Sequence, residues 1–177
     1  MAITITATAG SASANSFVTE LEQIAYMAAR LNASTWTTVS GSTCTETEKA
    51  AMVEATRELS NRRWQGMRVD DTQALSWPRD TVVNPDSATL NYYSTTAIPQ
   101  RIKDACCELA FQFLKLGTTD LAAEDALVGV IETHVDVIGK TLDPHLKTTG
   151  LARFPRVWSL IAPLLASSGI TTAVVRG

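Results

Sequence analysis

Two capping boxes mark the starts of helices in the first third of the chain, and they constrain its fold most strongly. In each box a threonine precedes a glutamate by three residues, Thr19 before Glu22 and Thr45 before Glu48. Each side chain of such a pair can accept a hydrogen bond from the backbone N–H of the other residue, which satisfies two donors at a helix start. We therefore predict helices that begin at these two threonines.

Apolar residues keep helical spacing behind both boxes. The first helix is expected to end at Asn32, and the residues that keep helical spacing in it are Leu21, Ile24, Ala25, Ala28 and Leu31. The second is expected to end near Trp64, before Gly66, and its predicted face consists of Met52, Ala55, Thr56 and Leu59.

Two prolines open the other predicted helices, since proline suits the first helical position. After Pro99 an apolar stripe runs to Gly117, a natural helix C-cap. The stripe consists of Ile102, Ala105, Cys106, Leu109, Ala110, Phe113 and Leu116. After Pro155 the chain is apolar nearly all round, and Pro163 should kink or end that helix because it removes an internal hydrogen-bond donor.

The segments between the helices predict little regular structure. Residues 33–43 form a Ser/Thr-rich loop pinned by Trp36, and residues 67–97 are expected to be irregular with one short hairpin. Within them, residues 73–79 are extended chain docked by Trp77. Residues 128–138 alternate and predict a half-buried strand, followed by a loop over 139–150. The expected fold is mainly α, a small bundle of about four helices with a small β element.

The two ends of the chain are predicted to be extended arms. Residues 1–16 carry a short alternating strand pattern at 3–6 and then a Gly/Ala/Ser stretch, and residues 167–177 follow the last helix. A helical domain over residues 17–166 stands between them. At 177 residues the chain is long enough to fold as one such domain without disulfides or metal.

Charge bears on the possible partners. Charged residues make up 19% of the chain and the net charge is −3, which argues against a general nucleic-acid binder. Residues 157–175 carry no charge and reach the length of a membrane span, but Pro163 and the breaker at 167–169 interrupt them. We favour a buried helix followed by a partner-binding arm over a membrane span, and the N-terminus has no secretory signal pattern.

No enzyme motif is present, and we expect neither catalysis nor a cofactor or metal. Nothing matches a nucleophile elbow or a phosphate loop, and Cys44, Cys106 and Cys107 have the spacing of free thiols rather than of a metal site. On the predicted strand, the side chains of Glu132, His134 and Asp136 share one face. Neighbours on that face stand roughly 6.5–7 Å apart, so a solvated face is a better interpretation than a zinc site.

One basic region could serve nucleic acid. Arg57, Arg62, Arg63 and Arg68 cluster around Trp64, and arginines with an aromatic ring can hold a single strand by phosphate contacts and base stacking. The alternative is that Trp64 belongs to the core at a helix end while the arginines pair with acids. The acidic net charge favours that alternative.

Several segments together resemble the head-tail connector (adaptor, or head-completion) proteins of tailed phages. The most specific is Leu-Ser-Trp-Pro-Arg at 75–79. The others are the segments at 15–18, 55–57, 64–66, 73–74, 98–99, 102–105, 108–110, 128–129 and 160–165, so the resemblance spans roughly residues 15–166. Phe17 stands where the family often has tyrosine. Some members are labelled "putative DnaT-like ssDNA-binding protein", a label that no residue pattern here supports independently.

The resemblance implies a structural virion protein, assembled in the host cytoplasm. Its subunits would form a dodecameric ring under the portal protein, join it to a stopper or tail-terminator protein, and let DNA pass without sequence readout. The motif residues with a structural role would be Trp64, Trp77, Pro78, Arg79 and Pro99. We expect the C-terminal arm to contact the portal or a neighbouring subunit through Ser168, Ile170, Ala173, Val174, Val175 and Arg176. The alternative function is single-stranded nucleic-acid binding through Arg57, Arg62, Arg63 and Trp64.

Overall fold

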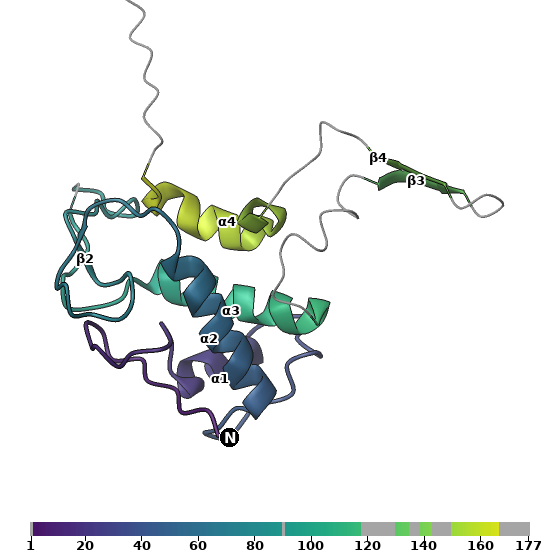
Figure 1. Cartoon of the computed structure of the whole chain (residues 1–177), viewed down its shortest axis with the longest axis horizontal. Helices are drawn as coiled ribbons and strands as arrows, with labels where there is room; N and C mark the ends of the chain where they lie inside the picture. The colour runs from purple at the N-terminus through teal and green to yellow at the C-terminus, as the bar shows by residue number, and fades with distance from the viewer. Residues whose placement is uncertain (1, 90, 118–129, 135–138, 143–149, 167–177) are drawn as a thin grey trace, which may run out of the picture.

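The fold is mainly α, as predicted, and the described residues form four helices and two small two-stranded sheets (Figure 1). The computed structural model describes residues 2–89, 91–117, 130–134, 139–142 and 150–166. The helices are α1 (Glu20–Ala28), α2 (Glu46–Ser60), α3 (Gln100–Leu116) and α4 (Pro155–Ile161). The strands are β1 (Met67–Arg68), β2 (Arg79–Asp80), β3 (Val130–His134) and β4 (Gly139–Leu142), and 3-10 turns cover Gly150–Arg153 and Ala162–Leu164.

Both capping boxes form as predicted. The Oγ1 atoms of Thr19 and Thr45 accept bonds from the backbone N–H of Glu22 (3.2 Å) and Glu48 (3.3 Å). In return, each threonine N–H donates to the glutamate carboxylate at 2.8 Å. These bonds satisfy N–H groups that would otherwise lack a partner, so the helices start one residue after the two threonines.

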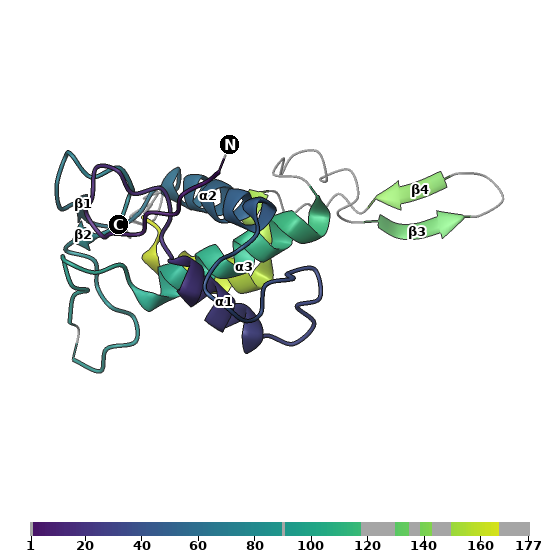
Figure 2. The same cartoon turned by 90° about the horizontal axis from the view of Figure 1, so that it is seen from below.

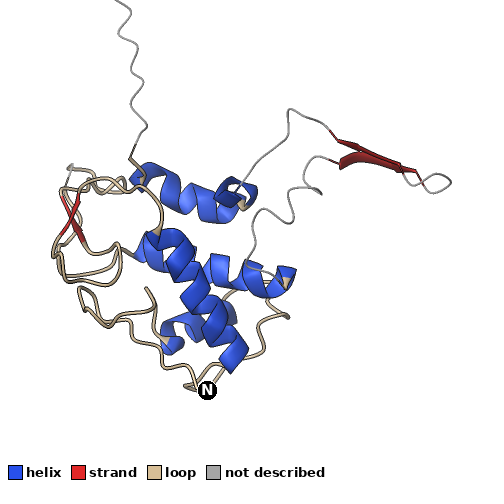
Figure 3. Ribbon diagram, viewed as in Figure 1, coloured by secondary structure: helices blue, strands red, loops and turns tan. Residues whose placement is uncertain are grey.

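Helix α3 is the centre of the core. It packs against α2, α4 and α1. The red strands β1 and β2 and the loops around them lie at the left of the helices in Figure 3. The predicted stripe of α3 is confirmed as buried except for its last member, Leu116, which is partly exposed. Gly117 caps the helix in the left-handed conformation (φ 67°), and its N–H donates to the Phe113 carbonyl.

Of the apolar residues that keep helical spacing behind the first capping box, only Ile24 is buried, and α1 ends at Ala28 rather than at Asn32. Ile24 is buried, together with Gln23 and Met27, whereas Leu21, Ala25, Ala28 and Leu31 are exposed. The inward side of α1 packs Ile24 and Met27 into the hydrophobic core, and Gln23 Nε2 donates to the Cys107 carbonyl of α3 at 3.4 Å.

Residues 61–99 form a loop region fastened by short antiparallel pairs. Met67 pairs with Asp80 in β1 and β2, and an isolated bridge joins Val83 to Tyr92. The pairing of β1 with β2 confirms the predicted short hairpin. The predicted docking of Trp36 and Trp77 is confirmed as well, because both rings are buried.

The second sheet corrects one expectation. β3 falls within the predicted strand at 128–138, and it pairs antiparallel with β4. β4 lies in the segment predicted as a loop, because its polar and glycine residues give little sign of a strand in the sequence.

Residues 2–16 lie against the helical core. The N–H of Ile3 donates to the Glu46 carboxylate at 2.6 Å, and the N–H of Ala74 donates to the Ser11 carbonyl at 3.1 Å. The strand pattern at 3–6 forms no strand in this described segment. Its backbone is held instead by Asn15, whose side chain bonds Thr4 and Thr6 at 2.8 Å.

The last helix is short. α4 ends at Ile161, and Pro163 lies in the 3-10 turn that follows, as its missing N–H predicts. Among the described residues no helix has the length and apolar character needed to cross a membrane. The predicted portal-contact residues of 167–177 lie outside the described residues.

Candidate nucleic-acid interface

The arginine region lies at the C-terminal end of α2. Arg57 forms an ion pair with Glu54, and Arg62 forms one with Glu58. Arg63 is exposed and has no ion pair within the described part of the chain. Two of the three arginines at this end of α2 therefore have a carboxylate beside them, and of these three Arg63 is the one most open to an anion. Arg68, the fourth arginine of the predicted region, lies in β1 and is also exposed.

Trp64 belongs to the core rather than to this surface. The residue is 4% exposed, its Nε1 donates to the Leu59 carbonyl at 3.0 Å, and its backbone bridges to Leu165. Its ring meets that of Trp77 edge to face, with centroids 5.6 Å apart. A buried ring cannot stack on a base, so this region offers phosphate contacts alone.

The most specific motif segment, residues 75–79, ties the loop region together. Arg79 donates from Nε to the Gln65 carbonyl (2.7 Å), from Nη2 to that of Gly66 (2.6 Å) and from Nη1 to that of Ser76 (3.2 Å). The Trp77 ring, wholly buried, meets Tyr93 edge to face at 6.2 Å. Pro78 and Pro99 are buried as well, and Pro99 is the N-cap of α3. All five motif residues therefore have structural contacts.

A buried carboxylate joins three helices. Glu108 of α3 accepts bonds from Tyr26 Oη (2.9 Å), Arg30 Nε (3.0 Å) and Arg156 Nη1 (3.1 Å). Arg30 also lies over the Phe111 ring, 4.0 Å from its centroid. These donors come from α1, the residues just after it, and α4, so the cluster holds both helices against α3. The sequence gives no sign of this cluster, because its members are up to 130 residues apart in the chain. They come together only through the fold.

Glu48 holds the loop before α2. Besides its capping bond, its carboxylate accepts from the N–H of Thr37 (2.8 Å) and of Thr38 (3.0 Å) and from Thr38 Oγ1 (2.6 Å). Burial raises the pKa of Glu48, but the bonds from Thr38, Thr45 and Thr37 outweigh burial and lower it to about 2. The capping box predicts only the contact with Thr45, whereas nothing in the sequence predicts the bonds from Thr37 and Thr38.

The cysteines are free and buried, as predicted. Burial raises the pKa of Cys44 to about 12 and that of Cys106 to about 11, so their thiolates are disfavoured near neutrality. Within the described residues no cluster of His, Cys, Asp or Glu could hold a metal ion. Asp136 and the side chains of Glu132 and His134 lie outside the described part of the structure.

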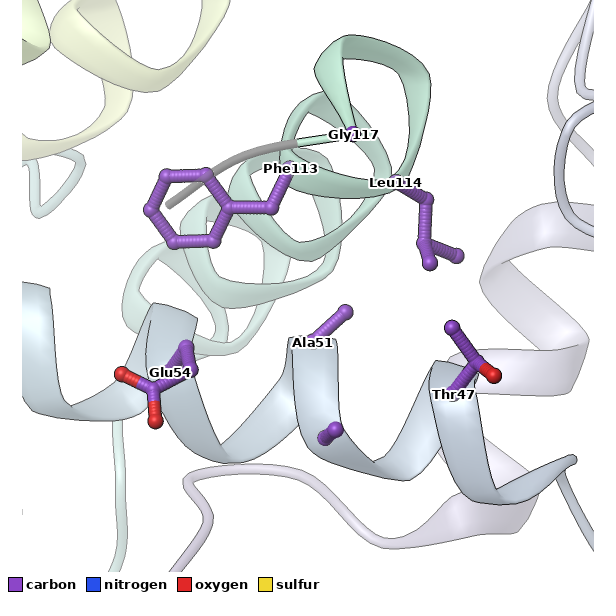
Figure 4. A pocket seen from close by; sticks show the side chains of 7 residues that line it. Thr47, Ala51, Glu54, Phe113, Leu114 and Gly117 are labelled. Carbon is purple, nitrogen blue, oxygen red and sulfur yellow. The ribbon is translucent and has the colours of Figure 1, made fainter. Parts of the chain in front are cut away.

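A groove of about 470 Å³ runs between α2 and α3 (Figure 4). Thr47, Ala51, Phe113 and Leu114 give it a mainly apolar lining, and Glu54 is its one charged residue. Because Glu54 pairs with Arg57, the groove adjoins the arginine region. It therefore presents a mainly apolar contact surface.

Comparison with known families decides the family. The family described as "Putative DnaT-like ssDNA binding protein" matches residues 1–177. The chain belongs to this family. No match was found among curated proteins or among solved structures. The DnaT-like label agrees with the alternative function drawn from the arginine region, and the identity of a phage connector rests on the sequence resemblance.

Proposed function

We propose that this DnaT-like protein binds single-stranded nucleic acid through phosphate contacts at the end of α2. The observation that carries the proposal is the family match over the whole chain. Arg57, Arg62 and Arg63 supply the positive charge, and Arg63 is exposed without an ion pair in the described structure.

The residues around these arginines determine how tightly the protein is expected to bind nucleic acid. Glu54 and Glu58 compete with phosphate for two of the three guanidinium groups, and the net charge of the chain is −3. Binding should therefore be weak, independent of base sequence and steeply dependent on salt. For three phosphates, the slope of log K against log salt should be about −2.

Fluorescence anisotropy with a labelled oligo-dT tests this proposal. Arg63→Glu should abolish most of the binding, while Lys115→Glu, the same charge reversal at the exposed end of α3, should leave it nearly unchanged. Absence of binding to the wild-type chain at low salt would contradict the proposal. So would equal losses in the two variants.

A second candidate is the head-tail connector, favoured by the amount of apolar surface left open. The large apolar side chains that are exposed include Leu21, Leu31, Met67, Tyr92 and Trp158. Surface of this kind suits a subunit that is covered by neighbours in an assembly. In this role the chain would form a dodecameric ring under the portal protein, join it to a stopper or tail-terminator protein, and let DNA pass.

Copy number separates the two candidates. A connector should be a stoichiometric component of purified virions, at about the copy number of the portal, by quantitative mass spectrometry. A nucleic-acid-binding protein that acts in the host cytoplasm should be absent from washed virions.

A further inference from the structure

Three arginines lack an ion pair within the described part of the chain, and they are close together in the sequence. They are Arg63, Arg68 and Arg79, all between residues 63 and 79. By contrast, a carboxylate lies beside each of Arg30, Arg57, Arg62, Arg101 and Arg156. These three guanidinium groups without a carboxylate therefore belong to the end of α2 and to the strand pair of β1 and β2.

Arg68 and Arg79 face each other across this strand pair. They are directly opposite in its antiparallel register, so their Cβ atoms should stand roughly 4.5–5.5 Å apart on one face. Burial and the charge of Arg68 lower the pKa of Arg79, which agrees with two guanidinium groups close together. Like charges in this position destabilise a strand pair. A local conflict of this kind is typical of a functional site, where charge is left for a ligand to neutralise.

Arg79 is already fixed in a position from which it can bind an anion. Its Nε, Nη2 and Nη1 donate to the backbone carbonyls of Gln65, Gly66 and Ser76. Three of the five N–H groups of the guanidinium are used in this way, and the other two have no partner in the described structure. Because the side chain is fixed, binding through the remaining groups costs little conformational freedom.

Arg68 can reach the same anion, because nothing in the described structure holds its side chain. The residue is exposed, and no described residue forms a hydrogen bond or an ion pair with its guanidinium. Bonds from Thr72 and the charge of Arg68 lower the pKa of Asp70, so this acid lies within reach of that charge. Its Oδ1 accepts instead from the N–H (2.7 Å) and the Oγ1 (2.8 Å) of Thr72.

We propose that Arg68 and Arg79 together bind one phosphate group of a single strand and extend the nucleic-acid interface from α2 onto β1 and β2. This inference rests on the proposed function. A phosphate between the two guanidinium groups replaces their repulsion with charge-assisted hydrogen bonds, which arginine forms readily with phosphate.

The strand pair is within reach of a strand bound at α2. Arg68 follows Arg63 by five residues, so their Cα atoms are at most about 18 Å apart. A single strand of about six nucleotides spans that distance. Figure 2 shows β1 and β2 at the left, beyond α2 and α3, and Arg68 is exposed there.

Arg68→Gln tests the pair without disturbing the bonds of Arg79. In fluorescence anisotropy with labelled oligo-dT, the variant should bind about tenfold more weakly than the wild type, because a charge-assisted contact is lost. The slope of log K against log salt should become shallower by about 0.7, the share of one phosphate of a single strand. Without ligand, the variant should melt at a higher temperature than the wild type, because the repulsion across the strands is gone.

Lys115→Gln is the matched control, since Lys115 is exposed at the end of α3, and it should change neither affinity nor melting temperature. A melting temperature of Arg68→Gln that falls together with the affinity would make Arg68 a structural residue and overturn the inference. Unchanged affinity and slope in Arg68→Gln, with binding lost in Arg63→Glu, would overturn the inference and leave the proposed function intact. No binding by the wild type would contradict the proposed function and this inference with it.

Inorganic phosphate distinguishes a free phosphate group from the phosphate of a nucleic acid. At equal phosphate concentration it should raise the melting temperature of the wild type less than oligo-dT does, because only the oligonucleotide also contacts Arg63. An equal rise would assign the pair to a free phosphate group and overturn the extension of the interface.

Discussion

The Glu48 carboxylate shows how one residue can carry two structural roles. It caps α2 through Thr45 and also fixes the loop at Thr37 and Thr38. Glu48→Gln keeps the shape but loses the charge that strengthens these bonds, and we expect a loss of about 2 kcal/mol in the free energy of unfolding. Urea denaturation measures it. Glu54→Gln, at a more exposed ion pair on the same helix, should cost less than about 0.5 kcal/mol, and a similar loss in both variants would contradict the role of Glu48.

Acid should weaken the same contacts. The folded protein lowers the pKa of Glu48 to about 2 from an ordinary 4.5, so the carboxylate is the form that folding favours. Its contribution is complete above pH 4.5 and is lost as the pH falls from 4.5 toward 2. Other carboxyl groups, such as those of Glu22 and Asp86, also have lowered pKa values. The difference in stability between wild type and Glu48→Gln isolates the residue, and it should shrink across this window.

Removing different members of the buried Glu108 cluster should lower the free energy of unfolding by different amounts. Glu108→Ala leaves the guanidinium group of Arg30 without its carboxylate, and we expect a loss of about 3–5 kcal/mol. Arg156→Ala should cost less than about 1 kcal/mol because that side chain is 69% exposed. Denaturant titration of both variants measures the two losses, and that of Glu108→Ala should be the larger. Equal losses in the two variants would contradict the minor role of Arg156 in the cluster.

At the scale of elements, the sequence predicts helix starts better than helix faces. Both capping boxes, the proline before α3 and Pro163 after α4 mark real boundaries, because each acts through backbone groups next to it in the chain. The face of α1 depends on what α3 offers, namely the Cys107 carbonyl and Glu108, and no local pattern contains that information. The same reason explains why β4 was expected to be a loop.

Two glycines with the same backbone conformation should differ in their tolerance of alanine. Gly66 (φ 65°) lies so close to β2 that a Cβ would stand 2.0 Å from the Asp80 carbonyl oxygen, whereas a Cβ at Gly117 (φ 67°) meets nothing within 4 Å. Gly117→Ala should cost about 1 kcal/mol, from the left-handed conformation alone. Gly66→Ala should cost about 2 kcal/mol more, because β1 and β2 must separate. Thermal denaturation of the two variants measures the difference, and equal losses would contradict this close approach.

At the scale of the molecule, the sequence predicts where the arginines of the candidate nucleic-acid interface lie, but it does not predict whether Trp64 is exposed beside them. The arginines at the end of α2 are visible in the sequence, but the burial of Trp64 is decided by Trp77 and Leu165, which come from distant segments. Of the two interpretations of Trp64, a core residue at a helix end is confirmed and a base-stacking ring is not. The family match favours nucleic-acid binding nonetheless, so the arginines rather than the ring carry the proposal.

The proposed contact between the C-terminal arm and the portal can be tested without disturbing the fold. A chain truncated after Ala166 keeps the bond from the Ala166 N–H to the Arg63 carbonyl (2.8 Å) and the bond from the Gln65 N–H to the Leu164 carbonyl (3.0 Å). Its melting temperature should therefore match that of the full chain, whereas truncation after Ala162 removes the buried Leu164 and should lower it.

If residues 167–177 bind the portal, the chain that ends at Ala166 should lose most of its retention on immobilised portal protein while keeping its affinity for oligo-dT. Undiminished retention would assign the portal contact to the folded domain. The comparison separates the two functions because the arginines at the end of α2 remain in both chains, so only the connector function depends on the segment removed.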